Sequence, residues 1–307
     1  MSSSALSSDQ IFGHVKDTHY FHVPRAFDVF DGDGHFKLPQ PIELERPIIL
    51  LNIDGMDEVN KMVENLDFKL TKFMVLELVV ALVIAVIFIH LAVRMTKSER
   101  PKGKMWNLLE SFLLFIRDDV ARPAIGHDAD KFLPYLWTIF FFVLGCNLIG
   151  MVPWMGTPTG ALAVTGVLAL ATFLVVIGSG MAKMGPVGFW LGQVPDMDLP
   201  FVLAILLKPM IFVIEIVGIL IKHFVLAVRL LANMFAGHIV LAVLVAFIGA
   251  VGSSVATYYH PLFVGVSVAS IFGATALSML ELFVAFLQAY IFTFLSALFI
   301  GMAVHPH

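Results

Sequence analysis

The chain has 307 residues, of which 59% are hydrophobic and 14% are charged, and its mean hydropathy is +0.91. Soluble domains carry about 45–50% apolar and about 25% charged residues, so the composition excludes a large soluble protein and indicates an all-α integral membrane protein. The net charge of −4 comes without a basic run suited to a phosphate backbone, so nothing in it supports nucleic-acid binding.

A polar, acidic leader precedes the first apolar segment. The leader, residues 1–72, contains "DGDGH" but lacks the later glycine and glutamate of a calcium loop, so we expect no metal site and no cofactor. Residues 73–93 supply the ~20 apolar residues that a bilayer core requires. Five basic residues follow: Arg94, Lys97, Arg100, Lys102 and Lys104. By the positive-inside rule they place the loop 94–131 in the cytoplasm and the leader outside.

Two features follow in chain order. Residues 105–120 predict an amphipathic helix at the cytoplasmic interface, because apolar side chains recur there at helical spacing and charged ones fall elsewhere. The apolar positions are Trp106, Leu109, Leu113, Ile116 and Val120. Residues 132–182 then predict a two-span hairpin closed by the tight turn "GTPTG", and the loop 183–198 returns to the cytoplasm.

The last segment, residues 199–307, contains two overlong apolar helices. Pro209 stands where a helix can begin, and the 39 residues from Pro209 to Phe247 would span ~58 Å against a hydrocarbon core of ~30 Å. The segment from Pro261 to Val304 is also too long. Each either breaks in two or tilts steeply, and we favour a tilted hairpin wrapped around a partner. The fold then has five crossings and a cytoplasmic C-terminus.

Polar residues lie inside these apolar helices. An arginine at mid-membrane, such as Arg229, costs about 2.5–3.5 kcal/mol to insert and cannot lose its proton. Either a neighbouring carboxylate pairs with it, or it faces a pathway or a partner's carboxylate. Asn233 shares its face, and Glu215 lies fourteen residues earlier, within about 40° of that face.

Three more polar residues complete the pattern. His238 lies nine residues after Arg229 and points the opposite way on a straight helix, ~13 Å nearer the outer side. Glu281 and Gln288 are seven residues apart on one face. In an antiparallel hairpin Glu281 is level with His238, and Gln288 is level with Arg229. Ionisable residues matched in depth predict a proton relay in two parts, one outer and one inner.

At this point the motifs "RLLANMFAGH" (229–238) and "LQAYIF" (287–292) resemble subunit a of the F-type ATP synthase. The stretches "RDDVARPAIG", "KFLPYLWTIFFFVLGCNLIGMVP" and "KPMIFVIEIVGILIK" resemble the same family in the same order. The resemblance covers about residues 105–300. It implies a stator subunit of the membrane sector, essential but non-catalytic, that couples proton flow to rotation and ATP synthesis.

The resemblance also implies roles for single residues. Arg229 corresponds to the arginine that faces the rotor-ring carboxylate, with Asn233 and Gln288 as its polar neighbours. Glu215 corresponds to the acid of the cytoplasmic half-channel. His238 and Glu281 correspond to the residues of the outer half-channel, and Asn147 corresponds to a polar residue of the first hairpin. Gly150 departs from relatives that carry an acid at that position.

The implied partners are a ring of c subunits, the b subunits of the peripheral stalk, the rest of the complex and lipid. The chain has no P-loop and is expected to bind no nucleotide. A bacterial inner membrane is the expected location and a mitochondrial inner membrane the alternative, with protons as the default ion. A secondary cation transporter and a passive anchor are the competing classes. The first is disfavoured because no internal repeat is found, and the second leaves the buried polar residues unexplained.

Overall fold

The computed structural model describes residues 20–22, 35–37, 71–96, 103–152, 155–192, 201–254 and 261–304. The principal elements are β1 (Tyr20–His22), β2 (His35–Lys37), α3 (Lys72–Met95), α4 (Lys104–Phe115), the π-helical turn η2 (Ile116–Ala121), α5 (Arg122–Ile125), α6 (Ala129–Gly150), α7 (Leu162–Met184), α8 (Pro186–Leu191), α9 (Phe201–Ser254) and α10 (Pro261–Val304). Two 3-10 turns, η3 (Gly126–Asp128) and η4 (Pro158–Gly160), precede α6 and α7. Most of the leader, the basic residues Lys97, Arg100 and Lys102, and the C-terminus at His307 lie outside the described residues.

Helices make up nearly all of the described chain. Five of them are long and apolar enough to cross a membrane: Lys72–Arg94, Lys104–Gly150, Leu162–Met184, Leu207–Leu244 and Val264–Val304. This confirms the expected helical, multi-pass membrane fold. The exception is in the leader, where β1 and β2 pair antiparallel although the sequence pattern there indicates no strand. The sidedness and tilt of the helices in a membrane stay predictions.

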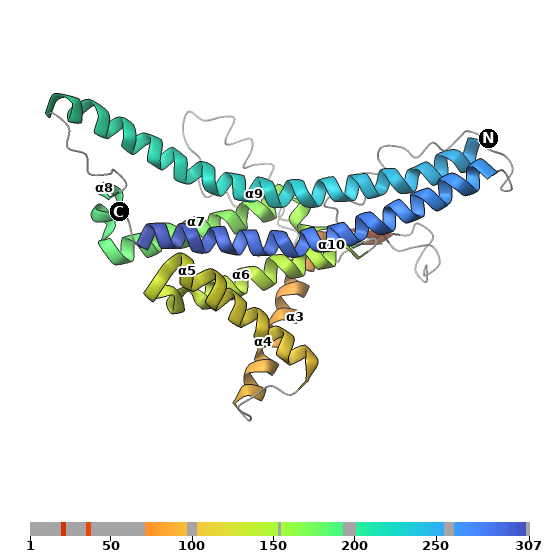
Figure 1. Cartoon of the computed structure of the whole chain (residues 1–307), viewed down its shortest axis with the longest axis horizontal. Helices are drawn as coiled ribbons and strands as arrows, with labels where there is room; N and C mark the ends of the chain where they lie inside the picture. The colour runs from red at the N-terminus through yellow and green to blue at the C-terminus, as the bar shows by residue number, and fades with distance from the viewer. Residues whose placement is uncertain are drawn as a thin grey trace.

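The two C-terminal helices are continuous. α9 has 54 residues and α10 has 44, so they are ~81 Å and ~66 Å long at ~1.5 Å per residue. Figure 1 shows them side by side along the long axis of the molecule, with α3 projecting away at a steep angle. Two such helices cannot stand upright in a ~30 Å hydrocarbon core, which supports the tilted hairpin over four short helices.

The expected start of α9 at Pro209 is wrong. The helix begins at Phe201, and Pro209 lies inside it. A proline in a helix removes one N–H donor and disfavours the helical conformation of the residue before it, which is why it often marks a first turn. Here the helix continues through the proline, with Lys208 and otherwise apolar residues around it.

The expected amphipathic helix forms, but it is not one regular helix. It runs as α4, passes through the π-helical turn η2 and ends as α5 at Ile125. Of its expected apolar positions Ile116 and Val120 have 0% exposure, whereas Trp106, Leu109 and Leu113 on α4 are only partly buried. The packing against α10 is tight: a Cβ at Gly301 would collide with the carbonyl oxygen of Ala124 on α5. A larger residue at 301 would separate the two helices.

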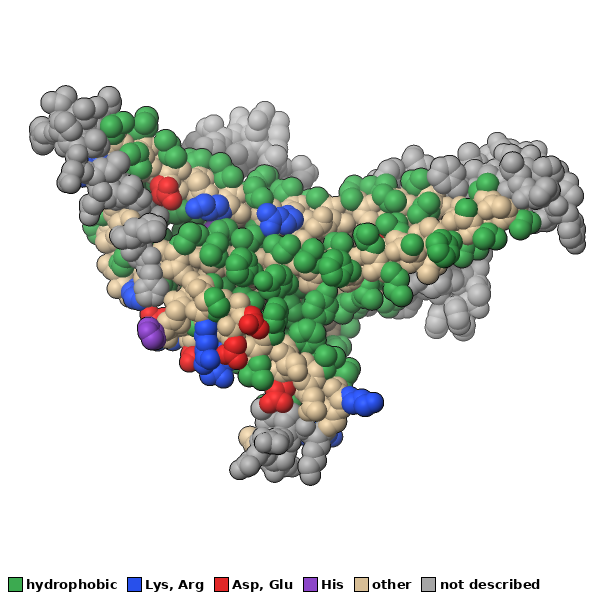
Figure 2. Space-filling model, in the orientation of Figure 1, with side chains coloured by type: hydrophobic (Ala, Val, Ile, Leu, Met, Phe, Trp, Pro, Cys, Tyr) green, Lys and Arg blue, Asp and Glu red, His purple; other side chains and the backbone are tan. Residues whose placement is uncertain are grey.

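Charged side chains gather at one end of the molecule, where α5, α6 and α7 meet (Figure 2). The Asp128 carboxylate accepts hydrogen bonds from Lys131 at 2.8 Å and from Lys183, at the end of α7, at 2.7 Å. Nearby, Nη1 of Arg122 lies 2.7 Å from Oδ1 of Asp118. Exposed pairs of this kind contribute only about 0–1 kcal/mol each. They fit an aqueous boundary for this end, while hydrophobic side chains cover most of α9 and α10 apart from a few charged side chains along α9.

The expected loop 183–198 is partly helical. Its first half contains α8, and Phe189 on α8 has 0% exposure. Phe189 lies against Gly180 on α7, where any Cβ would clash with the ring. The short helix therefore folds back onto the end of the hairpin. Residues 193–198 lie outside the described residues.

Candidate functional site

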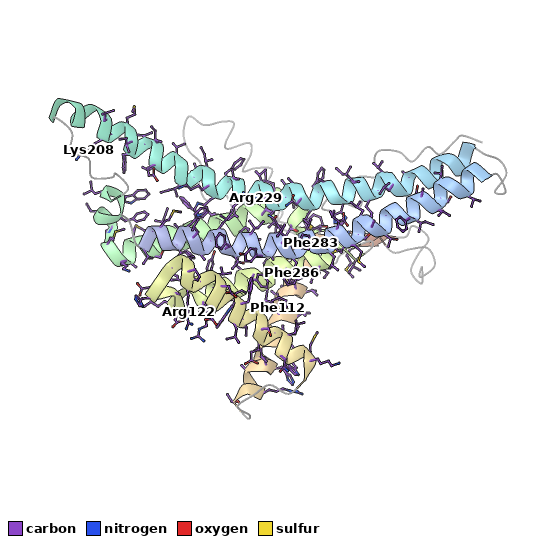
Figure 3. All side chains as sticks on the ribbon, viewed as in Figure 1. Phe112, Arg122, Lys208, Arg229, Phe283 and Phe286 are labelled. Carbon is purple, nitrogen blue, oxygen red and sulfur yellow. The ribbon has the colours of Figure 1, made fainter. Side chains whose placement is uncertain are left out.

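Four charged residues repeat at seven-residue intervals along α9: Lys208, Glu215, Lys222 and Arg229. Seven residues make nearly two helical turns, so the four side chains form a stripe that drifts by only ~20° per step. Lys208 and Lys222 are exposed, whereas Glu215 and Arg229 are partly exposed. Figure 3 labels the first and last members of this stripe on α9. The two lysines were missed from the sequence, although the same spacing could have found them.

Arg229 forms no ion pair with any residue in the part of the chain that the structure describes. An internal salt bridge, the structural alternative for this residue, is therefore not present there. Around Arg229 the same face of α9 exposes the small side chains Ala232 and Ala236. Small residues on a membrane helix let a second helix approach closely. Arg229 therefore lies on a face of α9 whose following turns carry small exposed side chains.

Asn233 and Gln288 are brought together across α9 and α10. The Asn233 side-chain N–H donates to Oε1 of Gln288 at 2.8 Å. Gln288 is only 1% exposed, and its Nε2 has no hydrogen-bond partner among the described residues. Sequence periodicity placed Gln288 level with Arg229. The hydrogen bond instead sets it level with Asn233, four residues or ~6 Å further along α9.

Glu281 and His238 lie at the same level of the helix pair. A Cβ added at Gly237 would meet Oε1 of Glu281, and would lie 3.3 Å from its Cγ. The carboxyl group therefore packs on the α9 backbone directly beside His238. Oε1 of Glu281 is buried without a hydrogen-bond partner in the described residues. The His238 ring, through Nε2, contacts the hydroxyl of Thr157.

Asn147 links the first hairpin to α10 at a point between Glu281 and Gln288. Its Oδ1 accepts from the Thr159 hydroxyl at 2.8 Å, and its Nδ2 donates to the Ala285 carbonyl at 3.2 Å. Asn147 is 0% exposed, so these bonds satisfy an amide that would otherwise be costly to bury. Ala285 lies between Glu281 and Gln288 on α10. The amide therefore fixes the position of α10 against α6.

Two threonines of "GTPTG" belong to this polar cluster, and the sequence indicated them only as part of a turn. Thr157 contacts His238, and Thr159 binds Asn147. They also account for Gly150, because a Cβ there would lie 2.6 Å from Oγ1 of Thr157. Any side chain at position 150 would displace the hydroxyl that contacts His238. The sequence could have indicated these two threonines as site residues, because the loop that closes the hairpin carries two hydroxyl side chains.

The polar residues form two separated groups. The first group lies at one level and consists of His238, Glu281, Thr157 and the contacts of Asn147. The second is Glu215, which lies 23 residues before His238 on α9, ~35 Å away along the helix. Arg229 stands between them. Carboxyl and imidazole groups can both accept and donate protons near neutral pH. Among the described residues no group of histidine, cysteine and acidic side chains could hold a metal ion.

The close packing of Glu281 on Gly237 predicts a stability difference between two glycines of α9. Gly237→Ala should lower the melting temperature of the purified protein, because the new methyl group displaces the Glu281 side chain and overpacking of this kind costs about 1–3 kcal/mol. Gly218→Ala is the matched control, since its Cβ meets no atom within 4 Å. That variant should be neutral or gain up to ~1 kcal/mol from helix propensity. Equal melting temperatures for the two variants would contradict the contact.

Comparison with known proteins gives a consistent result. The family model described as "ATP synthase A chain" matches residues 74–301. The chain is similar to ATP synthase subunit a of Chloroherpeton thalassium, 43% identical over 241 residues that cover 78% of this chain and 67% of the relative. It is also similar to ATP synthase subunit a of Myxococcus xanthus, 42% identical over 247 residues that cover 79% and 76% of the two chains.

Proposed function

The chain belongs to the ATP synthase subunit a family, and from this we propose that it is the stator subunit that carries protons across the membrane sector and turns their flow into rotation. It is a multi-pass membrane component of that complex. The observation that carries the proposal is Arg229, a permanent cation on an apolar helix with no ion-pair partner among the described residues. We infer that its counter-charge comes from another chain of the complex.

The partner that fits this surface is a ring of small apolar c subunits, each with one carboxyl group buried in the membrane. An ionised carboxylate is strongly disfavoured in lipid, so each ring site crosses the lipid protonated. Opposite Arg229 the ionised form is stabilised by the guanidinium charge. Ala232 and Ala236 allow a ring helix to come close to Arg229, where the low dielectric strengthens this interaction.

The two polar groups act as offset half-channels. Protons from the outer side reach the ring through His238, which contacts Thr157, and Glu281, which packs on the neighbouring Gly237. Glu215 receives protons from the ring on the cytoplasmic side. Arg229 lies between the two groups and repels a proton that would pass directly, so a proton crosses only when the ring turns.

Asn233, Gln288 and Asn147 support this arrangement. The Asn233–Gln288 hydrogen bond joins α9 to α10 one turn from Arg229, and Asn147 joins α6 to α10 beside it. Each bond fixes a helix that carries a translocation residue. We propose that they hold the half-channel groups at their distances from the ring and do not themselves relay protons.

The remaining assignments follow from the same premise. The peripheral-stalk b subunits and the other subunits of the complex are the further partners, and the bacterial relatives support a bacterial inner membrane. Nucleotide binding belongs to other subunits, since this chain has no P-loop. The chain is therefore an essential, non-catalytic part of the complex.

Purification under mild detergent tests the proposed function. We expect the chain to purify with an oligomeric ring of small apolar subunits, because the surface around Arg229 is complete only against carboxylate-bearing helices. The complex is isolated through an affinity tag on the chain, and its subunits are identified by mass spectrometry. Recovery of a single species that transports a cation without a ring would indicate a secondary transporter, and recovery of an inert single species would indicate an anchor.

A further inference from the structure

Three side chains, His90, Arg94 and Trp106, join the end of α3 to the start of α4, and we call them the α3–α4 corner. Nε of Arg94 donates a hydrogen bond to Nε2 of His90 at 3.0 Å, and Cζ of Arg94 lies over the Trp106 ring, 5.2 Å from its centroid. The His90 and Trp106 ring centroids are also 5.2 Å apart. These contacts hold the guanidinium where the first membrane-spanning helix ends.

The guanidinium of Arg94 remains accessible at this corner. The residue is exposed, and apart from the bond between Nε and His90 its guanidinium forms no hydrogen bond or ion pair with the described residues. Its two Nη groups can therefore donate to a ligand, and they present their N–H bonds in a fork that matches the oxygens of a phosphate group. The exposed Lys104, which begins α4, adds a second cation.

The charge of the sequence around the corner indicates an anionic ligand. Residues 90–108 contain five basic residues and one acidic residue, Glu99, so the net charge of this segment is +4 with His90 neutral. His90 is neutral when its Nε2 accepts the hydrogen bond from Arg94. A cluster of basic residues directly after a membrane span attracts the anionic headgroups of lipids.

Apolar surface lies beside the corner on both helices. On α3, Ile89 and Val93 are 64% and 48% exposed, and on α4, Met105 and Leu108 are 68% and 51% exposed. Figure 1 shows α3 ending and α4 beginning at the tip that projects away from α9 and α10, and Figure 2 shows basic and hydrophobic side chains at this tip. A soluble anion would contact only the cations, whereas an anion with long apolar chains would cover both kinds of surface.

We propose that the α3–α4 corner binds an anionic phospholipid, whose phosphate accepts hydrogen bonds from the Nη groups of Arg94 and whose acyl chains lie on the exposed apolar side chains of α3 and α4. The Trp106 ring lies at the level of the headgroup, the depth at which tryptophan is enriched in membrane proteins. The bound lipid joins the end of α3 to the start of α4 and holds α4 at the membrane surface. No residue of the corner belongs to the proposed half-channels, so the occupancy of this site is measured without any assay of proton flow.

Photolabelling of the assembled complex in liposomes tests this site. The probe is phosphatidylglycerol with a photoreactive diazirine at the start of one acyl chain, and phosphatidylcholine with the same diazirine is its zwitterionic comparator. We expect the phosphatidylglycerol probe to label residues 86–93 and 104–108 about tenfold more than the comparator, a ratio equivalent to ~1.4 kcal/mol. Unlabelled phosphatidylglycerol should compete. Equal labelling by the two probes, or the same enrichment at the exposed residues 264–283 of α10, would overturn the proposal. Displacement of the probe by millimolar inorganic phosphate would also overturn it, because the site would then take a soluble anion.

Three variants identify the groups that hold the lipid. Arg94→Gln removes the charge and should reduce labelling by the phosphatidylglycerol probe about tenfold, while labelling by the comparator is unaffected. Trp106→Leu removes the ring that orients the guanidinium and should reduce the same labelling about threefold, the size of an exposed cation–π contact. Arg122→Gln is the matched control, since it makes the same change at an exposed arginine that already pairs with Asp118, and it should label as the unaltered chain does. Unchanged labelling of Arg94→Gln counts against the site, as does an equal loss in Arg122→Gln.

Discussion

Arg229→Ala is expected to abolish ATP-driven proton pumping by the assembled complex, while passive proton leak through the membrane sector persists or rises. The reason is that one charge has two effects: it stabilises the ionised ring carboxylate, and it separates the two half-channels. Without it the ring site does not release its proton productively, and the direct route is open. Acidification of inverted vesicles on ATP addition measures the first effect, and proton permeability of vesicles stripped of the catalytic sector measures the second.

A second substitution at the same position sharpens the result. Arg229→Lys keeps a cation but loses the planar guanidinium, and a buried lysine can lose its proton, so it should be nearly as damaging as alanine. Lys131→Ala is the control, since it removes a cation from an exposed ion pair that contributes about 0–1 kcal/mol. That variant should pump within about twofold of the unaltered complex. Normal coupled pumping by Arg229→Ala would refute the proposed mechanism whatever the family membership.

The outer pair is expected to give the second large effect. Glu281→Gln or His238→Ala should slow ATP-driven pumping at least tenfold, because removing a positioned acid–base group typically costs about 10²–10⁴ in rate. Glu281 packs beside His238 on α9, so the loss of either group interrupts the same relay. Initial rates of vesicle acidification provide the measurement. Ser278→Ala is the control on α10, since that hydroxyl bonds only to the Ala274 carbonyl of its own helix among the described residues.

Exchange of the two residues distinguishes a paired role from two separate ones. The double variant His238→Glu with Glu281→His keeps one acid and one imidazole at the same level. The Thr157 hydroxyl that contacts His238 can donate to a carboxylate as well as to a ring nitrogen, so the new side chain keeps a partner. We expect the exchange to restore part of the lost rate. If both single variants pump normally, the assignment of the outer half-channel is wrong.

Local features of the sequence were enough for the helices and for the main candidate residues. A run of about 20 apolar residues reports a membrane span without reference to the rest of the chain, and helical periodicity reports which residues share a face. For this reason α3 lies close to the expected residues 73–93, α6 and α7 fall on the expected hairpin 132–182, and α9 and α10 are overlong as expected. The cost of a permanent charge in lipid singled out Arg229 on the same local basis.

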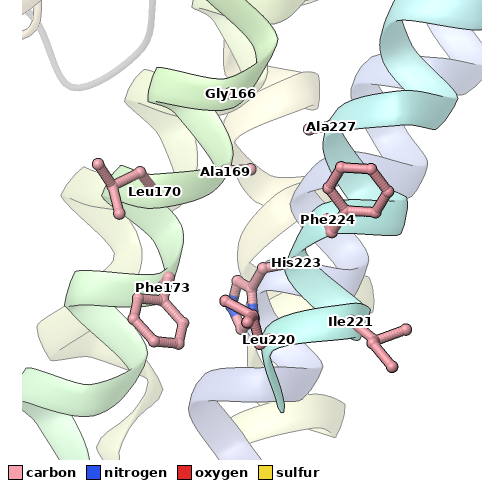
Figure 4. A pocket seen from close by; sticks show the side chains of 9 residues that line it. All are labelled: Gly166, Ala169, Leu170, Phe173, Leu220, Ile221, His223, Phe224 and Ala227. Atoms are coloured by element: carbon pink, nitrogen blue, oxygen red, sulfur yellow. The ribbon is translucent and has the colours of Figure 1, made fainter. Parts of the chain in front are cut away.

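Only the tertiary structure decided how the helices meet. The register of α10 against α9 depends on contacts such as Glu281 on Gly237, between residues far apart in the chain, and periodicity within one helix carries no information about it. Gln288 therefore pairs with Asn233 and not at the level of Arg229. The same holds for the pocket beside His223, which is lined by residues of both α7 and α9 (Figure 4). Spacing along one helix fixes the direction in which each side chain points and its position along the helix axis. Side-chain packing between helices fixes which polar groups touch.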